Sequence, residues 1–144
     1  MEEFEPSEAL KRALRMADGD TVFRFTGKVP KRKFDHLVFD GVEKLHPAEL
    51  APTLRDLLRK ARKTLLLITP LSAQATEPYL FPEDNEDPRR LIKWPLEMWL
   101  DFIRRGVEVP ADFIITGSWH YPGLRPASSQ VPKSTGFIQF TRIS

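Results

Sequence analysis

The sequence predicts a single α/β domain whose sheet is partly parallel. The main observation is a strand, helix, strand unit at 34–70, in which two apolar runs flank a helical stretch. Parallel strands need this order because a crossover must carry the chain back to the starting end of the sheet. The second observation is the order that follows: a strand at 64–68, a helix at 96–105, then strands at 112–117 and 136–143. A chain of 144 residues with 41% hydrophobic residues suits one such domain and is too short for two.

The amino-terminal part predicts one helix and one strand. Ser7 suits the N-cap of a helix whose apolar stripe runs to Ala17, and the turn at 18–20 is expected to end it. The β-branched and aromatic residues of Thr21–Thr26 predict a strand. A basic loop at 27–33 is expected to follow this strand.

The central unit has the clearest periodicity. The run His36–Phe39 shows no polar alternation, as expected of a strand buried on both faces. A helix is expected from Pro47 to Ala61, restarted or kinked at Pro52, with leucines at helical spacing on its inner side. Thr64–Ile68 predicts a central strand, because it too lacks polar alternation.

Two long connections interrupt the carboxyl-terminal half, although residues 1–144 are expected to form one domain. Residues 71–94 carry several prolines and acidic residues, and the length of this loop predicts a functional or mobile segment. Pro95 opens the next expected helix and Gly106 closes it. A Pro/Ser-rich loop is expected at about 120–134, before the last strand.

Composition excludes several classes of site. The chain has no cysteine and only His36, His46 and His120, with no pair of histidines at helical i, i+4 spacing, so we expect no metal site. The acidic amino terminus lacks the pattern of a secretory signal, and no run approaches the roughly 18 apolar residues of a membrane helix. A cytoplasmic protein is therefore expected. Arginine outnumbers lysine and cysteine is absent, which is compatible with a thermophilic source.

The charge is unevenly distributed although the net value is only +2. One basic cluster lies at 28–33, a second at 55–63 and a third at 89–93, and the acidic run 83–87 stands against them. Each cluster has two interpretations, a solvated face or helix end, or a binding surface for an anionic partner. The sequence does not choose between them.

The segment FDHLVFDGVEKLHP, together with LLRKARKTLLLITP, resembles the middle of class I S-adenosylmethionine-dependent methyltransferases. The family has a Phe-Asp strand, a Val-Leu-Glu-His-Leu-Pro-like turn, a leucine-rich helix with a basic end, and a strand ending in Thr-Pro. The later WPLEMWLDFIRRG resembles the family's Pro-x-x-x-Trp helix and its glycine. The matching positions of the first segment are Phe34, Asp35, Leu37, Val38, Val42, Glu43, Leu45 and Pro47. The resemblance implies a partial Rossmann-like, methyltransferase-type sheet with a C-terminal antiparallel hairpin.

The chain departs from that family where the family binds its cofactor. Class I enzymes hold S-adenosylmethionine at a glycine-rich turn after the first strand, where bare backbone N–H groups approach the ligand. Here no two of the seven glycines fall at G-x-G spacing, and the acidic residue that grips the ribose has no counterpart. We therefore expect a truncated, degenerate scaffold that binds no cofactor and is not an enzyme by itself. If it were an enzyme, Glu43 and His46 would be the candidates for a general base, although a helix-capping turn explains both.

Three functions follow from these observations. The first is a non-catalytic protein-interaction regulator, most concretely a phage-type protein that binds bacterial RNA polymerase or a sigma factor and regulates transcription. The second is one subunit of a split methyltransferase whose glycine-rich half lies on another chain. The third is a nucleic-acid-binding module that uses the clusters at 28–33 and 55–63. The candidate partner-binding residues are Arg89, Arg90, Lys93, Trp94, Trp99, Arg59, Arg62 and Lys63. For the tryptophans, core packing is the competing interpretation.

Overall fold

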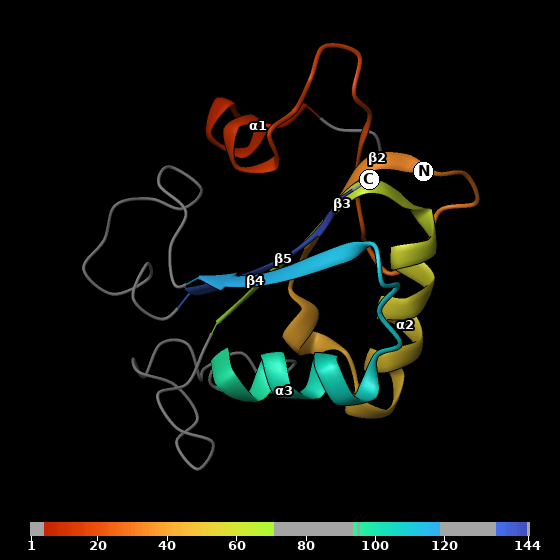
Figure 1. Cartoon of the computed structure of the whole chain (residues 1–144), viewed down its shortest axis with the longest axis vertical. Helices are drawn as coiled ribbons and strands as arrows, with labels where there is room; N and C mark the ends of the chain where they lie inside the picture. The colour runs from red at the N-terminus through yellow and green to blue at the C-terminus, as the bar shows by residue number, and fades with distance from the viewer. Residues whose placement is uncertain (1–4, 71–93, 95, 119–134, 144) are drawn as a thin grey trace.

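A computed structural model describes residues 5–70, 94, 96–118 and 135–143, and these residues form a three-layered α/β arrangement (Figure 1). In chain order the elements are α1 (Glu8–Leu14), β1 (Val22–Arg24), β2 (Phe34–Asp40), the 3-10 turn η1 (Val42–Lys44), α2 (Pro47–Lys60), β3 (Ala61–Pro70), α3 (Leu96–Gly106), β4 (Phe113–Ser118) and β5 (Thr135–Arg142).

The described strands form one mixed sheet of order β1-β2-β3-β5-β4. β1, β2 and β3 are parallel, whereas β5 runs antiparallel to both β3 and β4. β3 lies in the middle, as its continuous apolar run predicted, because a strand with neighbours on both sides and helices on both faces meets no water. The predicted fold class, an α/β domain with C-terminal antiparallel strands, is confirmed.

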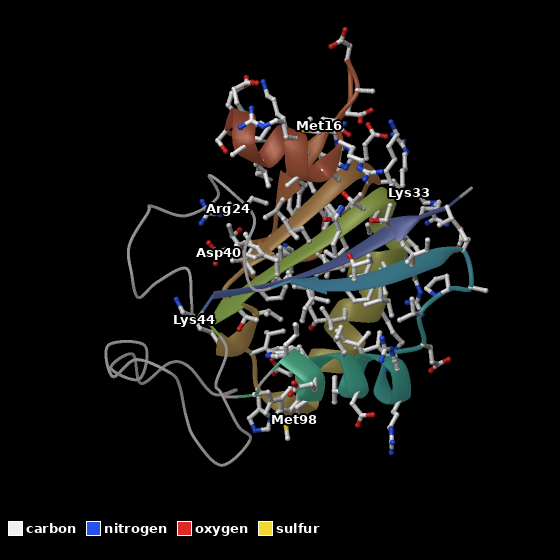
Figure 2. All side chains as sticks on the ribbon, turned by 60° about the vertical axis from the view of Figure 1, so that its left-hand side comes forward. Met16, Arg24, Lys33, Asp40, Lys44 and Met98 are labelled. Carbon is white, nitrogen blue, oxygen red and sulfur yellow. The ribbon has the colours of Figure 1, made fainter. Side chains whose placement is uncertain are left out.

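The two faces of the sheet carry different helices. α2 and α3 cover one face, where Leu57, Leu65 and Trp99 belong to the larger core (Figures 1 and 2). α1 lies on the other face, where Leu10 and Leu14 pack on the side chains of Val22, Val38, Leu66, Ile68 and Phe137. Because side chains alternate along a strand, His36 and Thr64 share this second face with Val38 and Leu66.

Several expected boundaries are wrong. α1 ends at Leu14, and Arg15 takes the left-handed conformation, so Ala17 is exposed and not part of an inner stripe. The helix α2 is not restarted at Pro52, because it runs continuously from Pro47 to Lys60 with this proline inside. β2 and β3 are both longer than predicted, because the ladder between them begins at Phe34 and Ala61, and β3 continues to Pro70 in its pairing with β5. The loops expected at 71–94 and 120–134 lie almost wholly outside the described residues.

Candidate functional site

The fold brings two of the basic clusters together at one end of the sheet, the end where the parallel strands begin. The Nζ of Lys60, at the end of α2, donates a hydrogen bond of 2.7 Å to the backbone carbonyl of Lys31, in the loop before β2. In Figure 2, Lys33 lies at this end, opposite Arg24, Asp40 and Lys44. We call this surface the basic end; it comprises Lys31, Arg32, Lys33, Arg59, Lys60, Arg62, Lys63 and Arg142.

Four carboxylates contact the basic end without neutralising it. Asp56 pairs with Arg59 at 2.8 Å, and Asp35 lies 3.9 Å from Arg62 while accepting hydrogen bonds from Thr21. Asp20 and Asp112 pair with Lys63 and Arg142. Eight cations against these four carboxylates leave an excess of positive charge, and Arg62 keeps 57% of its side chain exposed. The surface therefore favours an anionic partner.

Two arginines of the basic end are held by aromatic rings and carbonyls. The guanidinium of Arg32 lies 4.4 Å from the ring centroid of Phe34, and that of Arg142 lies 4.4 Å from the ring centroid of Phe113. Arg142 also donates to the carbonyls of Arg62 and Ala61 at 2.8 and 3.0 Å. These contacts orient the arginines, so less conformational entropy is lost when an anion binds.

A buried polar network connects Lys63 of the basic end to the interior of the protein. The Nε2 of His36 lies 2.8 Å from the carboxylate of Asp20, and its Nδ1 lies 2.6 Å from the Oγ1 of Thr64. The same carboxylate accepts hydrogen bonds from the Nζ of Lys63 at 2.6 Å and from the backbone N–H of Ala17 at 2.9 Å. The network thus ties β2, β3 and the loop after α1 into one unit.

These contacts lower the pKa of Asp20. Burial of the carboxylate raises its pKa, but the hydrogen bonds from Lys63, Ala17 and His36 outweigh burial and hold the pKa at about 2, against the usual 3.8. The hydrogen bond to Asp20 in turn raises the pKa of Lys63. Both groups are therefore charged at neutral pH.

The order hydroxyl, imidazole, carboxylate in Thr64, His36 and Asp20 is also that of nucleophilic triads. Here Thr64 is only 2% exposed and His36 only 1% exposed. Both side chains are thus almost wholly withdrawn from solvent, and the hydroxyl is already engaged with the imidazole. The geometry therefore assigns the network to positioning Lys63 and the loop after α1.

The opposite end of the sheet is where the resemblance to methyltransferases would put a cofactor. Arg24 ends β1 and Asp40 ends β2, and with Lys44 they line a cavity of about 280 Å³ (Figure 2). His46 is exposed and caps α2, because its Nδ1 accepts a hydrogen bond of 3.1 Å from the N–H of Ala48. This is the capping arrangement that competed with a general-base role. The side chain of Glu43 lies outside the described residues.

The candidate surface around α3 needs a correction. Trp99 is fully buried with 0% exposure, so it is a core residue and not a contact for a partner. The reason is that its ring packs between α3 and the sheet, with the half-buried Trp94 ring at 5.0 Å. Trp94 and Phe102 line a cavity of about 320 Å³ on the outer side of α3. Arg89, Arg90 and Lys93 lie outside the described residues.

Sequence reasoning missed the buried network and the contribution of Arg142. A signal for the network was present, because His36 and Thr64 are polar residues in strands expected to be buried, and buried polar groups are paired. The partner Asp20 had no local signal, since its turn resembles many others. Among the residues that the structure describes, no group of three or more His, Cys, Asp or Glu side chains could hold a metal ion. Nor does any helix in this part of the chain have the length and apolarity to cross a membrane.

Comparisons with known proteins support the fold. No family model and no curated protein matches the chain. A solved structure of the Pnkp1/Rnl/Hen1 RNA repair complex is similar over 92% of this chain, with a TM-score of 0.50 and 16% sequence identity. The crystal structure of the small RNA methyltransferase HEN1 is similar over 78% of this chain, with a TM-score of 0.48 and 12% identity.

The chain spans only 28% and 14% of the length of those two proteins. At such low identity the first likeness concerns the fold alone, and the second is too weak to add an argument. The sheet topology and the first likeness agree on a mixed, partly parallel α/β fold.

Proposed function

We propose that this chain binds nucleic acid through the basic end of its sheet. The observation that carries the proposal is the hydrogen bond from Lys60 to the carbonyl of Lys31, which joins two basic clusters into one surface. Phosphate groups are regularly spaced anions, and a surface of several oriented arginines and lysines releases their counterions on binding. The carboxylates at this end are already occupied by ion pairs, so they do not repel a phosphate backbone strongly.

The proposal is tested by the salt dependence of binding. For a single strand the slope of log K against log salt is about −0.7 per phosphate contacted, so three to five contacts give a slope of about −2 to −3.5. The double variant Lys33→Gln and Arg62→Gln removes two exposed cations of the basic end. We expect it to weaken binding by about tenfold at low salt and to reduce the slope by about 1.4.

The matched control is the double variant Arg104→Gln and Arg105→Gln on α3. It changes the net charge by the same amount, and both residues are exposed on α3 and are not part of the basic end. Fluorescence anisotropy of a labelled oligonucleotide reports both affinities. Equal losses in the two double variants would mean that only net charge matters, which would remove the basic end as the site.

RNA is the first probe to use. The similar solved structure belongs to an RNA repair complex, but a likeness in fold does not transfer a ligand. DNA of the same sequence is therefore measured beside RNA. Phosphate contacts alone predict similar affinities, whereas contacts to the 2′-hydroxyl predict a preference for RNA.

The second part of the proposal is that the chain does not transfer methyl groups by itself. Two features support it. β1 leads into β2 through the loop at 25–33, which has no helix and no G-x-G spacing. Calorimetry with S-adenosylmethionine is the direct test: saturable binding with a Kd of about 10 μM or tighter, about 7 kcal/mol, would overturn this part of the proposal. A split enzyme would gain such binding only when a second chain is added.

A protein-interaction regulator is the second candidate. The observation that favours it is the cavity on α3, where Trp94, Met98 and Phe102 present half-buried apolar side chains beside Asp101 and Arg105. Bacterial RNA polymerase or a sigma factor is the partner to test first by capture of the purified proteins. Met98→Asp should abolish such capture and leave nucleic-acid binding unchanged. No capture by the unaltered chain would remove this candidate.

A further inference from the structure

A groove lies beside α1, on the part of the sheet that this helix leaves uncovered. α1 packs through Leu10 and Leu14 over β1, β2, β3 and Phe137 of β5, and no described residue of β4 belongs to this cluster (Figure 1). On this face β4 is the less covered strand, with Ile114 at 49% exposure, whereas Phe137 and Gln139 of the neighbouring β5 are buried. The cavity has a volume of about 590 Å³. We call it the α1 groove.

The α1 groove is lined by cations and by neutral hydrogen-bonding groups. Arg12 and Arg15 come from α1 and its cap, while Lys63 and Arg142 come from β3 and β5. No carboxylate is among the described residues that line it. The remaining polar groups are uncharged: Thr64, Thr116, Gln139 and Thr141, with His36 at the floor. Such a lining favours a ligand with concentrated negative charge and hydrogen-bonding atoms.

Two of the four cations are available for a ligand. Lys63 is paired with Asp20, and Arg142 is paired with Asp112. Arg12 and Arg15, by contrast, make no ion pair with another described residue. Because two buried leucines anchor α1 to the sheet, the backbone that carries both arginines is fixed at the edge of the α1 groove.

The backbone at Arg15 adds an independent observation. This residue has φ 54° and ψ 49°, the left-handed conformation in which a helix cap usually has glycine. For a residue with a Cβ this conformation costs about 1–2 kcal/mol. Among the described residues, Arg15 is the non-glycine residue with positive φ, and its side chain lines the α1 groove. A strained arginine at a site rim is consistent with a role for its side chain in binding.

We propose that the α1 groove binds one phosphorylated nucleotide. Its phosphate lies between Arg12 and Arg15, and its base or ribose lies against the exposed Ile114. The volume is within the roughly 300–1,000 Å³ of small-molecule sites and excludes a double helix. The source of the nucleotide is either the phosphorylated end of a strand or a free mononucleotide. The first source rests on the proposed function, because Lys63 and Arg142 belong to both the basic end and the α1 groove.

The experiment compares RNA strands of one sequence that carry a 5′-phosphate, a 3′-phosphate or only hydroxyl ends. A terminal phosphate carries almost two charges and lacks a second ester, so it fits a cluster of arginines better than an internal phosphate. We expect a preference of at least about fivefold for one phosphorylated end, or about 1 kcal/mol. Adenosine or uridine monophosphate should compete with it, and should bind more tightly than inorganic phosphate.

The variants separate the α1 groove from the basic end. Arg12→Gln and Arg15→Gly should each abolish the preference for the phosphorylated end and leave the affinity for hydroxyl-ended RNA within about twofold. Arg15→Gly also relieves the backbone strain, so its melting temperature should not fall. Lys11→Gln is the control on α1, because Lys11 pairs with Glu8 and does not line the groove.

The outcomes distinguish the two proposals. Equal affinity for all three strands, together with no binding of a mononucleotide, would overturn the groove proposal and leave the basic end intact. Mononucleotide binding that Arg12→Gln abolishes, without any RNA binding, would support the groove and overturn the proposed function. A preference for phosphorylated ends that survives both groove variants would refute the assignment to this site.

Discussion

The buried carboxylate of Asp20 gives a quantitative prediction for stability. The substitution Asp20→Asn keeps the shape of the side chain but removes its charge. The new amide keeps one accepting oxygen, but its NH2 group cannot accept, so it cannot satisfy all the hydrogen bonds that Lys63, Ala17 and His36 now direct at the two carboxylate oxygens. We expect the variant to be less stable than the original chain at neutral pH. The difference in their unfolding free energies should become smaller in acid.

The magnitude follows from the pKa. In the folded protein the pKa of Asp20 is about 2, against 3.8 without the surrounding fold. At about 1.4 kcal/mol per pKa unit, the ionised carboxylate contributes about 2.5 kcal/mol to the free energy of unfolding at pH 7. Because the folded pKa is the lower one, this contribution is present above pH 4 and is lost as pH falls toward 2. About half of it should remain at pH 3.

The assay is urea denaturation followed by tryptophan fluorescence, to which the fully buried Trp99 contributes. The difference in unfolding free energy between the original chain and Asp20→Asn is measured at pH 7, 5 and 3. Other titrating groups largely cancel in this difference, so it should shrink by about 1 kcal/mol between pH 7 and pH 3.

Asp18→Asn is the matched control. It removes an exposed carboxylate from the same turn, and its effect should stay within about 0.5 kcal/mol at every pH. A difference for Asp20→Asn that is independent of pH would refute the reasoning, because it would show that the carboxylate is not preferentially ionised in the folded state.

Three further predictions concern the packing. Leu57→Ala should lower the free energy of unfolding by about 2–5 kcal/mol in urea denaturation, because this leucine is fully buried. The neighbouring Asp56→Ala should lower it by less than about 1 kcal/mol, and equal losses would show that Leu57 is not on the inner face of α2. Gly41→Ala should lower the melting temperature through a backbone strain of about 1 kcal/mol, since Gly41 has φ 95°, and an unchanged melting temperature would contradict it. Gly117→Val should lower the free energy of unfolding by about 1–3 kcal/mol through overpacking, because even a Cβ at this position would lie 2.9 Å from the Cδ1 of Leu96. A more stable variant in the same urea assay would show that α3 moves freely away from β4.

The sequence alone determined the order and type of the main elements. The leucines of α2 recur at helical spacing, and Leu65–Leu67 form a run without polar alternation. These patterns are local, because a helix or a buried strand is encoded in residues a few positions apart. The resemblance carried by the segment 34–47 added the expectation of antiparallel strands at the carboxyl end, which the sheet order bears out.

Which side chains meet depends on the tertiary structure. Lys60 and Lys31 are 29 residues apart, and Lys63 and Asp20 are 43 apart, so their contacts depend on how β1, β2 and β3 align. The same holds for Trp99, whose burial depends on the side of α3 that faces the sheet. Strand register and helix packing arise from the summed burial of many distant residues, and no short stretch of sequence contains that sum. The basic end and the α1 groove are therefore formed by the fold, and the sequence contains their residues without showing that they lie together.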